Sequence, residues 1–343
     1  MSAKGVIFHE YGDSSKLKIE DVPIEEPTKG HVRVKMMAVG LNRAEVVFVE
    51  GKFTEQPKDL RKGSSLGYEG AGIVDKVGEG VKKFKVGDRV AVLCNVLMSE
   101  YPTNMEECIF PEYALVKMLD GQSFQDAAST WLAYLTAYFA LVTNAKLKKG
   151  DWAVITAAGS SAGLAAVQMA KYLGANVIAT SRTSSKRDLL MKFGADRFIA
   201  TNEEDIKEKI LEYTGGKGAH LIYDSVGGDW LEKLADATAV RGIIIEYGKP
   251  GPKPMILPYY QCFSKFLTFK VYFMAEYTTL PDCLEEAVQF INKLLPKTQS
   301  IVGKTFKGIE QLPEGHKFLE GNNVFGKAVV EFSDCGKTSM PSQ

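Results

Sequence analysis

The sequence predicts an α/β protein in which a doubly wound parallel sheet is inserted into a β-rich domain. Residues 1–125 consist of short β-rich runs separated by Gly and Pro turns, which is typical of a compact β domain. Residues 126–266 alternate short apolar runs with amphipathic helices, the pattern of a parallel sheet covered on both faces. Residues 267–343 return to strand-like runs. We therefore expect the two ends of the chain to form one domain around the central block.

The individual elements follow from residue type and periodicity. In the first part, β-branched and aromatic runs bounded by turn residues predict strands at 4–12, 31–42, 70–80, 86–94 and 112–119. In the central block, buried runs predict strands at 152–158, 176–182, 197–201, 219–228 and 242–248. Amphipathic stretches between them predict helices at 161–175, 184–195, 203–216 and 229–240. The last part predicts a helix at 281–296, strands within 300–311 and 326–332, and a frayed tail.

The amino-acid composition limits the classes of binding partner that we expect. Lys plus Arg and Asp plus Glu number 42 each, so the summed charge gives no reason to expect nucleic acid or an anionic membrane. No stretch approaches the length of a spanning helix or the form of a signal peptide. The five cysteines are odd in number and widely spaced, which is typical of reduced thiols. We expect a cytoplasmic protein that binds a small molecule.

A candidate ligand-binding turn, AAGSSAG (157–163), follows the first central strand. A dinucleotide-binding turn in this place lets the backbone approach a pyrophosphate at the start of the next helix. On the GxGxxG pattern the chain has glycine only at the last of the three positions, where it lets the helix pack closely on the strand. The serines offer hydroxyl donors as well as backbone N–H groups. The candidate cofactor residues are Ser160, Ser161, Ala162 and Gly163; the alternative is a tight turn that binds nothing.

The residues after the second central strand favour NADP(H) over NAD(H). NAD-binding sites usually place Asp or Glu there to accept hydrogen bonds from the adenosine ribose. This chain has no carboxylate in the stretch and instead carries Ser181, Arg182, Lys186 and further hydroxyls and cations. Such groups suit a 2′-phosphate. The alternative is a solvated helix start capped by Ser184.

A succession of motifs resembles the medium-chain dehydrogenase/reductase superfamily. The motifs are GLNRAEVVFVEGKF (40–53), LGYEGAGIVDKVGEGVKKFKVGDRV (66–90), LAYLTAYFAL (132–141), AAGSSAG (157–163), DSVGG (224–228) and GKAVV (326–330). The resemblance covers residues 3–332 and is strongest to the zinc-free quinone oxidoreductase branch, which contains zeta-crystallin. It implies a GroES-like catalytic domain around a Rossmann domain, with the active site in the cleft between them. It also implies a homodimer formed by extending the central sheet.

The resemblance argues against a metal. Zinc-dependent relatives have a Gly-His-Glu motif whose His binds the metal, where this chain reads Gly67, Tyr68 and Glu69. Those relatives also have a Cys near the position of Asn42. Their structural-zinc lobe needs four closely spaced Cys, where this chain has only Cys94 and Cys108. The four histidines lie elsewhere in the sequence. Because a catalytic zinc needs three protein ligands, we expect no metal.

The resemblance also implies which residues approach the nicotinamide. Asn42 matches an Asn near the ribose and nicotinamide, and Thr136 matches a position beside the ring. Gly326 and Lys327 match a Gly-Lys pair in contact with the cofactor. Each has a structural alternative: a turn residue for Asn42, an interior helix residue for Thr136, and a surface β-turn for the pair. The backbone facing the carboxamide would belong to Tyr247 and Gly248.

Phe53 is an informative departure from the family. Relatives usually have a Tyr here, a proposed substrate-stacking residue or, in the enoyl-thioester reductases, a proton donor. The EGKF motif keeps the ring but loses the hydroxyl, so Phe53 cannot act as an acid. Water, Tyr68 or Tyr134 would have to supply a proton. We assign no general acid.

Together these observations predict NADPH-dependent reduction of quinones or related electrophilic carbonyl compounds by hydride transfer without a metal. One alternative is an NADPH-dependent reductase of alkenals, enones or enoyl thioesters, which must hold an extended acyl chain. Another is an NADPH-binding protein with a structural or regulatory role. The aromatic segment PYYQCFSKFLTFKVYFMAEY (258–277) either lines a substrate pocket or, as we prefer, lies at a subunit contact.

Overall fold

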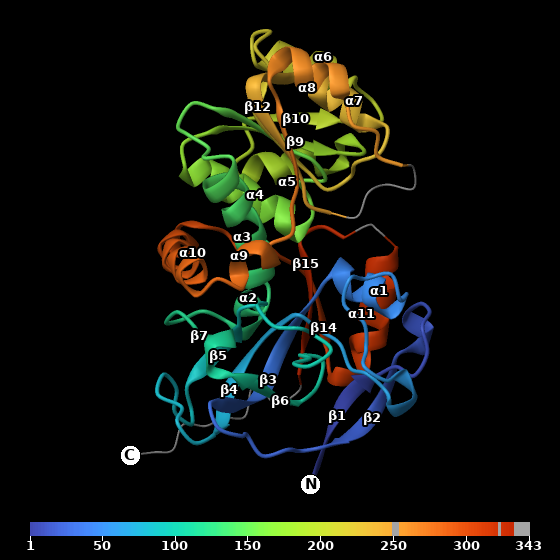
Figure 1. Cartoon of the computed structure of the whole chain (residues 1–343), viewed down its shortest axis with the longest axis vertical. Coiled ribbons are helices and arrows are strands. Elements are labelled where there is room, and N and C mark those ends of the chain that lie inside the picture. Colours follow the sequence, from blue (N-terminus) through green and yellow to red (C-terminus); the bar gives the residue numbers. More distant parts are fainter. Residues whose placement is uncertain (249–253, 322–323, 333–343) are drawn as a thin grey trace. The chain divides into compact units, whose positions relative to one another are not determined.

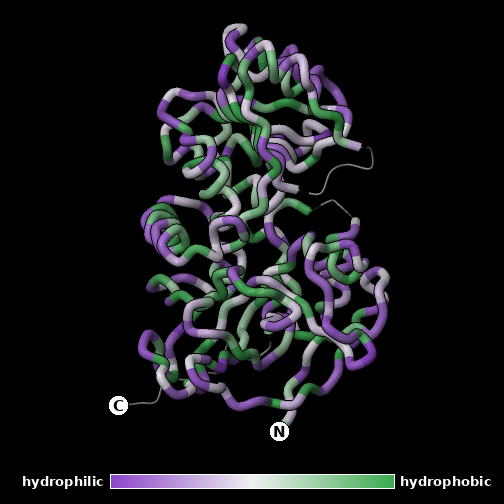
Figure 2. Tube along the Cα trace, viewed as in Figure 1, coloured by the Kyte–Doolittle hydropathy of each residue, from purple (hydrophilic) through white to green (hydrophobic). Residues whose placement is uncertain are grey.

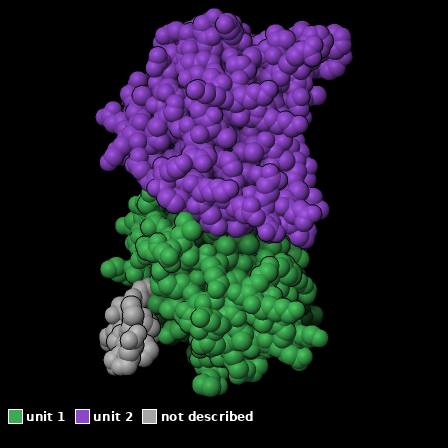
Figure 3. All heavy atoms as spheres, turned by 90° about the vertical axis from the view of Figure 1, so that its left-hand side faces the viewer, with its two compact units in different colours: residues 1–132, 300–343 green, residues 133–299 purple. Residues whose placement is uncertain are grey.

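The computed structural model describes residues 1–248, 254–321 and 324–332, and its chain divides into two compact units (Figure 3). The first unit contains residues 1–132 and 300–343, and the second contains residues 133–299. The predicted insertion of a central block between two ends of one domain is therefore confirmed. The return to the first unit comes at residue 300 rather than 267.

The first unit is built on a mostly antiparallel sheet with the order β14-β15-β3-β4-β5-β7, in which β6 also pairs with β3 (Figure 1). Separately, β1 and β2 form an antiparallel pair. The α-helices among the described residues of this unit are α1 (Arg43–Val49), α2 (Phe124–Ala127) and α11 (Leu312–Glu320). The strands are β1 (Ser2–Ile7), β2 (Lys18–Pro23), β3 (His31–Leu41), β4 (Glu69–Val77), β5 (Arg89–Val92), β6 (Glu107–Pro111), β7 (Leu115–Lys117), β14 (Val302–Lys307) and β15 (Lys327–Glu331).

The second unit is a parallel sheet with the order β10-β9-β8-β11-β12-β13 among its described residues. This order, with crossover helices between successive strands, is that of a doubly wound dinucleotide-binding sheet, so the predicted fold class is confirmed. The strands are β8 (Trp152–Ile155), β9 (Asn176–Ser181), β10 (Arg197–Ala200), β11 (Ala219–Asp224), β12 (Thr238–Glu246) and β13 (Thr268–Val271). The helices are α3 (Trp131–Tyr138), α4 (Ser161–Tyr172), α5 (Arg187–Lys192), α6 (Ile206–Tyr213), α7 (Trp230–Asp236), α8 (Tyr259–Lys265), α9 (Ala275–Thr278) and α10 (Pro281–Leu294).

The core of the second unit explains this arrangement. Val154, Ile178, Ile199, Ile222 and Ile244, one from each of five adjacent strands, are fully buried against α6 and α7. Figure 2 shows hydrophobic residues running along these strands. Continuous apolar strands of this kind must be covered on both faces. In open sheets of this class, ligands bind outside the carboxyl ends of the strands.

Two sequence predictions are wrong in detail. Residues 267–299 belong to the second unit because β13 pairs in parallel with β12 from Thr268 to Val271 and so extends the central sheet. The helix predicted at 229–240 ends at Asp236 and β12 begins at Thr238, because Ala237 and Thr238 continue the buried sheet core. Within the described residues, no helix is long and apolar enough to cross a bilayer.

Candidate functional site

The turn between β8 and α4 has the geometry of a phosphate-binding turn. Ser160 is the N-cap of α4, and its Oγ accepts a hydrogen bond from the Gly163 N–H at 3.1 Å. A Cβ on Gly163 would lie 2.7 Å from the Ala158 Cα and carbonyl oxygen, so only glycine allows this helix to approach this strand, as the sequence predicted. Ser161 and Ala162 form the first residues of α4.

The turn after β9 carries two neighbouring cations. Ser181 ends the strand, Arg182 follows it, and a short 3-10 helix spans Ser184–Lys186. Burial lowers the pKa of Lys186, and the charge of Arg182 lowers it further. Two cations held this close favour an anion. The alternative of a helix start capped by Ser184 is wrong: the N-cap is Thr183, and Ser184 instead donates to a carboxylate from the turn after β10.

At the end of β12, aromatic and acidic groups meet the turn after β11. The ring of Tyr247 stacks on that of Tyr223 with centroids 3.9 Å apart. A Cβ on Gly248 would lie 2.8 Å from the Ser225 Cβ, so the two turns pack closely. Glu246, opposite Asp224 in the register, is buried, and burial raises its pKa to about 9. Glu246 is therefore neutral at pH 7.

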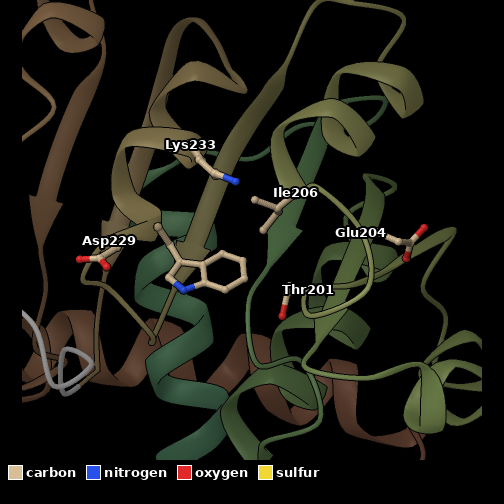
Figure 4. Close-up of a pocket in the computed structure, with 6 residues that line it drawn as sticks. Thr201, Glu204, Ile206, Asp229 and Lys233 are labelled. Carbon is tan, nitrogen blue, oxygen red and sulfur yellow. The ribbon is translucent and has the colours of Figure 1, made fainter.

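Because parallel strands share one direction, all of these turns lie at the carboxyl edge of one sheet. A pocket of about 220 Å³ opens at the same edge, after β10 (Figure 4). Its lining comes from the turn after β10 and the starts of α6 and α7: Thr201, Glu204, Ile206, Asp229, Trp230 and Lys233. The Thr201 N–H donates to the Ser181 carbonyl at 2.8 Å, so the pocket lies beside the start of the cationic turn.

Thr136 also belongs to the second unit and lies within α3. Its hydroxyl donates to Met274 Sδ at 3.5 Å, and its carbonyl accepts a hydrogen bond from the Tyr272 hydroxyl at 3.3 Å. The Tyr134 hydroxyl, buried nearby in the same helix, accepts from Gln168 Nε2 at 3.1 Å. Tyr134 is 2 % exposed and serves packing within this unit.

In the first unit the structure brings Asn42 and Lys327 together, although 284 residues separate them in the chain. Lys327 Nζ donates to Asn42 Oδ1 at 2.6 Å and forms an ion pair with Glu69. Lys327 and Glu69 are each 1 % exposed, so the predicted alternative of a surface β-turn is wrong. Gly326 has φ +74°, and a Cβ there would lie 2.3 Å from the Ile301 carbonyl oxygen. Only glycine can therefore precede the buried lysine.

The amide of Asn42 has a fixed orientation. Its Nδ2 donates to the Gly40 carbonyl at 3.0 Å, to Glu69 Oε1 at 3.1 Å and to Glu45 Oε1 at 3.2 Å. Its Oδ1 faces the Lys327 ammonium. Since both amide protons point at protein acceptors, Asn42 offers a ligand an acceptor lone pair and no donor.

Sequence reasoning missed a buried acid and histidine beside this group. Glu45 is fully buried, and burial raises its pKa to about 7. Glu45 Oε2 accepts from Asn104 Nδ2 at 3.2 Å and lies 3.4 Å from His316 Nε2. Burial lowers the His316 pKa to about 4, so the imidazole is neutral at pH 7. The Asn-x-x-Glu spacing of a capping box signals Glu45, whereas nothing local signals Asn104 or His316.

Phe53 and Tyr68 meet in the same unit, edge to face, with ring centroids 6.1 Å apart. Tyr68 is 8 % exposed, and burial raises its pKa far above the usual range. The phenol therefore keeps its proton at any physiological pH.

The positions that hold zinc in metal-dependent relatives do not fit a zinc ion here. Asn42 and Glu69 are both bound to the Lys327 ammonium, which repels a second cation. Tyr68 is held as a neutral phenol, and a neutral phenol is a poor ligand. Among the described residues, no group of three or more His, Cys, Asp or Glu side chains is arranged to hold a metal.

Comparisons with known proteins agree with this geometry. Residues 28–122 match the alcohol dehydrogenase GroES-like domain, and residues 162–293 match the zinc-binding dehydrogenase family. Quinone oxidoreductase 1 of Escherichia coli is 35% identical over 246 residues, which cover 72% of this chain and 73% of the relative. The 2-haloacrylate reductase of Burkholderia sp is 30% identical over 94% of this chain and 97% of its own.

A solved structure, Escherichia coli quinone oxidoreductase complexed with NADPH, superposes with a TM-score of 0.85. It is 27% identical in sequence and covers 96% of this chain and 99% of its own. A GroES-like domain joined to a doubly wound dinucleotide-binding sheet defines the medium-chain dehydrogenases/reductases. The chain belongs to this family, in its quinone oxidoreductase branch, and is an oxidoreductase.

Proposed function

We propose that the chain catalyses NADPH-dependent reduction of quinones or related electrophilic carbonyl compounds by hydride transfer without a metal. The observation that carries this proposal is the turn Ser181–Lys186, with two adjacent cations at the carboxyl edge of the sheet. A relative of the same branch was solved with NADPH. The 2′-phosphate of NADPH would be held by Ser181, Arg182 and Lys186.

The rest of the cofactor would follow the same edge. The pyrophosphate would meet Ser160, Ser161, Ala162 and Gly163, where N–H groups open the helix. The adenine, attached to the same ribose as the 2′-phosphate, would enter the pocket that begins at Thr201. Tyr247 and Gly248 would line the nicotinamide end, together with Thr136. When bound, NADPH supplies the hydride.

The first unit would contribute the groups that orient the acceptor and the nicotinamide ribose. Phe53 and Tyr68 provide two rings in edge-to-face contact, which suit a flat conjugated acceptor. Asn42, held by Lys327 and Glu69, would accept a hydrogen bond from a ribose hydroxyl. A quinone takes up a hydride and then a proton, and solvent can protonate its oxygen, so no protein acid is required.

A second candidate is reduction of a conjugated carbon–carbon double bond. The similarity to 2-haloacrylate reductase favours it, as does the Tyr68 phenol, which keeps its proton beside Phe53. Hydride addition to the β-carbon leaves an enolate that must be protonated at the α-carbon. If this is the reaction, Tyr68 would deliver that proton.

The test is NADPH oxidation by the metal-stripped protein, run in parallel with an ortho-quinone and with a 2-alkenal, with NADH as the control cofactor. We expect quinone-dependent turnover that prefers NADPH and survives chelation. Turnover with the alkenal alone would favour the double-bond reductase. Binding of NADPH without oxidation by either acceptor would overturn both and favour a cofactor-binding role. The cytoplasmic location stays a prediction.

We further propose a homodimer formed through β13. Among the described strands β13 is an edge of its sheet, and an open edge is a template for pairing with a second copy. Aromatic side chains of α8, the helix that precedes β13 in the chain, and of the residue after it are strongly exposed: Tyr259, Tyr260, Phe263 and Phe266. An apolar patch of this kind marks an interaction site.

Light scattering should give twice the 37.7 kDa chain mass, and Tyr260→Glu combined with Phe263→Glu should give the single-chain mass. A wild-type protein that stays monomeric at concentrations used for structural work would contradict the dimer.

A further inference from the structure

The structure supplies a carboxylate to the turn in which the sequence shows none. Glu203, from the turn after β10, accepts hydrogen bonds at Oε1 from the Ser184 N–H at 2.9 Å and from the Ser184 hydroxyl at 3.3 Å. Ser184 lies between Arg182 and Lys186 in the chain. The proposed 2′-phosphate turn therefore contains an acid as well as two cations.

Backbone hydrogen bonds hold the acid in this place. The Thr201 N–H donates to the Ser181 carbonyl at 2.8 Å, and the Asn202 N–H donates to the Arg182 carbonyl at 2.9 Å. These two bonds continue the β9–β10 pairing into the turns. Glu203 follows directly, so its position relative to Arg182 is set by the sheet.

The neighbouring residue Glu204, not Glu203, stabilises the turn between β10 and α6. Glu204 Oε2 accepts from the Ala200 N–H at 2.8 Å and lies 3.7 Å from the Arg187 guanidinium. Glu203 is exposed, and its side chain contacts Ser184. Loss of the Glu203 carboxylate therefore leaves the β10–α6 turn in place.

We propose that Glu203 is a specificity-determining residue that allows this turn to accept NADH as well as NADPH. The proposal rests on the proposed function, since it assumes that the adenosine ribose lies at the Ser181–Lys186 turn. In NAD-binding doubly wound sheets a carboxylate at the end of the second strand hydrogen-bonds the ribose 2′-hydroxyl. Glu203 comes from the turn after the third strand, but its contact with Ser184 brings a carboxylate to the end of the second strand. The same carboxylate repels the 2′-phosphate of NADPH, which the two cations attract.

The two cofactors should therefore respond to Glu203 with opposite signs. Replacing the carboxylate by an amide weakens a charge-assisted hydrogen bond to the ribose of NADH. The same change removes a like charge from beside the 2′-phosphate of NADPH. A residue that only supported the fold would change both affinities in the same direction.

The experiment measures dissociation constants of NADPH and NADH for wild type and Glu203→Gln by fluorescence titration at low salt. We expect the NADH constant to rise about fivefold and the NADPH constant to fall about threefold. Glu208→Gln is the matched control, because Glu208 is an exposed acid on α6, the helix that follows the same turn. It should move neither constant. Unchanged constants in Glu203→Gln, or shifts of the same sign, would overturn the role of Glu203.

A second variant separates this proposal from the one on which it rests. If Arg182→Ala with Lys186→Ala weakens NADPH binding while Glu203→Gln changes neither cofactor, the 2′-phosphate site stands and the role of Glu203 is wrong. If the double alanine variant leaves NADPH binding unchanged, the cofactor does not use this turn and both proposals fall.

Discussion

Replacing Lys327 with Met is expected to lower the free energy of unfolding of the first unit by about 3–5 kcal/mol. The substitution removes the ammonium that pairs with Glu69 and leaves a carboxylate that is 1 % exposed without its counter-charge. Asn42 also loses the donor that fixes its Oδ1. Urea unfolding followed by circular dichroism measures the loss.

Two further variants test whether the unpaired Glu69 carboxylate causes the loss of stability in Lys327→Met. Lys307→Met removes an exposed cation from β14, the strand beside β15, and should change the free energy of unfolding by no more than about 0.5 kcal/mol. Adding Glu69→Gln to Lys327→Met removes both charges and should recover part of the loss, because no uncompensated charge stays buried. A loss of less than about 1 kcal/mol in Lys327→Met would mean that water reaches the Glu69 carboxylate.

Replacing both Arg182 and Lys186 with Ala is expected to raise the dissociation constant of NADPH on the order of 100-fold at low salt. Each cation would give the 2′-phosphate a charge-assisted hydrogen bond, and both are lost. NADH has no 2′-phosphate, so its constant should change by less than about threefold. Titration of both cofactors by fluorescence measures the difference.

The matched control removes two cations elsewhere in the same unit. Lys192 and Lys217 are exposed, and their double alanine variant changes the net charge equally without touching the turn. If this control weakens NADPH binding as much as the Arg182 and Lys186 variant does, the effect comes from the summed charge of the protein and not from a site. The difference should shrink as salt screens exposed charges.

The sequence predicted much of the fold because the relevant signals are local. Buried apolar strands alternating with amphipathic helices identify a parallel sheet, and Gly163 identifies a place where a helix packs closely on the turn that precedes it. The domain boundary at 266 was wrong because the short run Thr268–Val271 carries no sign of which sheet it joins. Only pairing with β12 decides that.

In the candidate site, too, the sequence predicted some features, and only the tertiary structure decided others. Ser160, Arg182 and Lys186 follow strand ends, and strand ends of a parallel sheet meet at one edge whatever the details of packing. The approach of Lys327 to the cofactor stays a prediction, and the structure shows its ammonium buried against Asn42 and Glu69. No pattern in the sequence relates these three residues, because β15 reaches β3 only after the whole second unit has been inserted.

By itself, the sequence determined the class of this protein: an inserted doubly wound sheet, a βα turn closed by Gly163, and cations without an acid after the second central strand. The tertiary structure alone decided which charges meet. It buried Lys327 with Glu69, set His316 beside Glu45, and brought Glu203 to Ser184. The physical reason is that helices and strands depend on the types and spacing of neighbouring residues. Which charged side chains meet depends instead on sheet pairing between segments far apart in the chain.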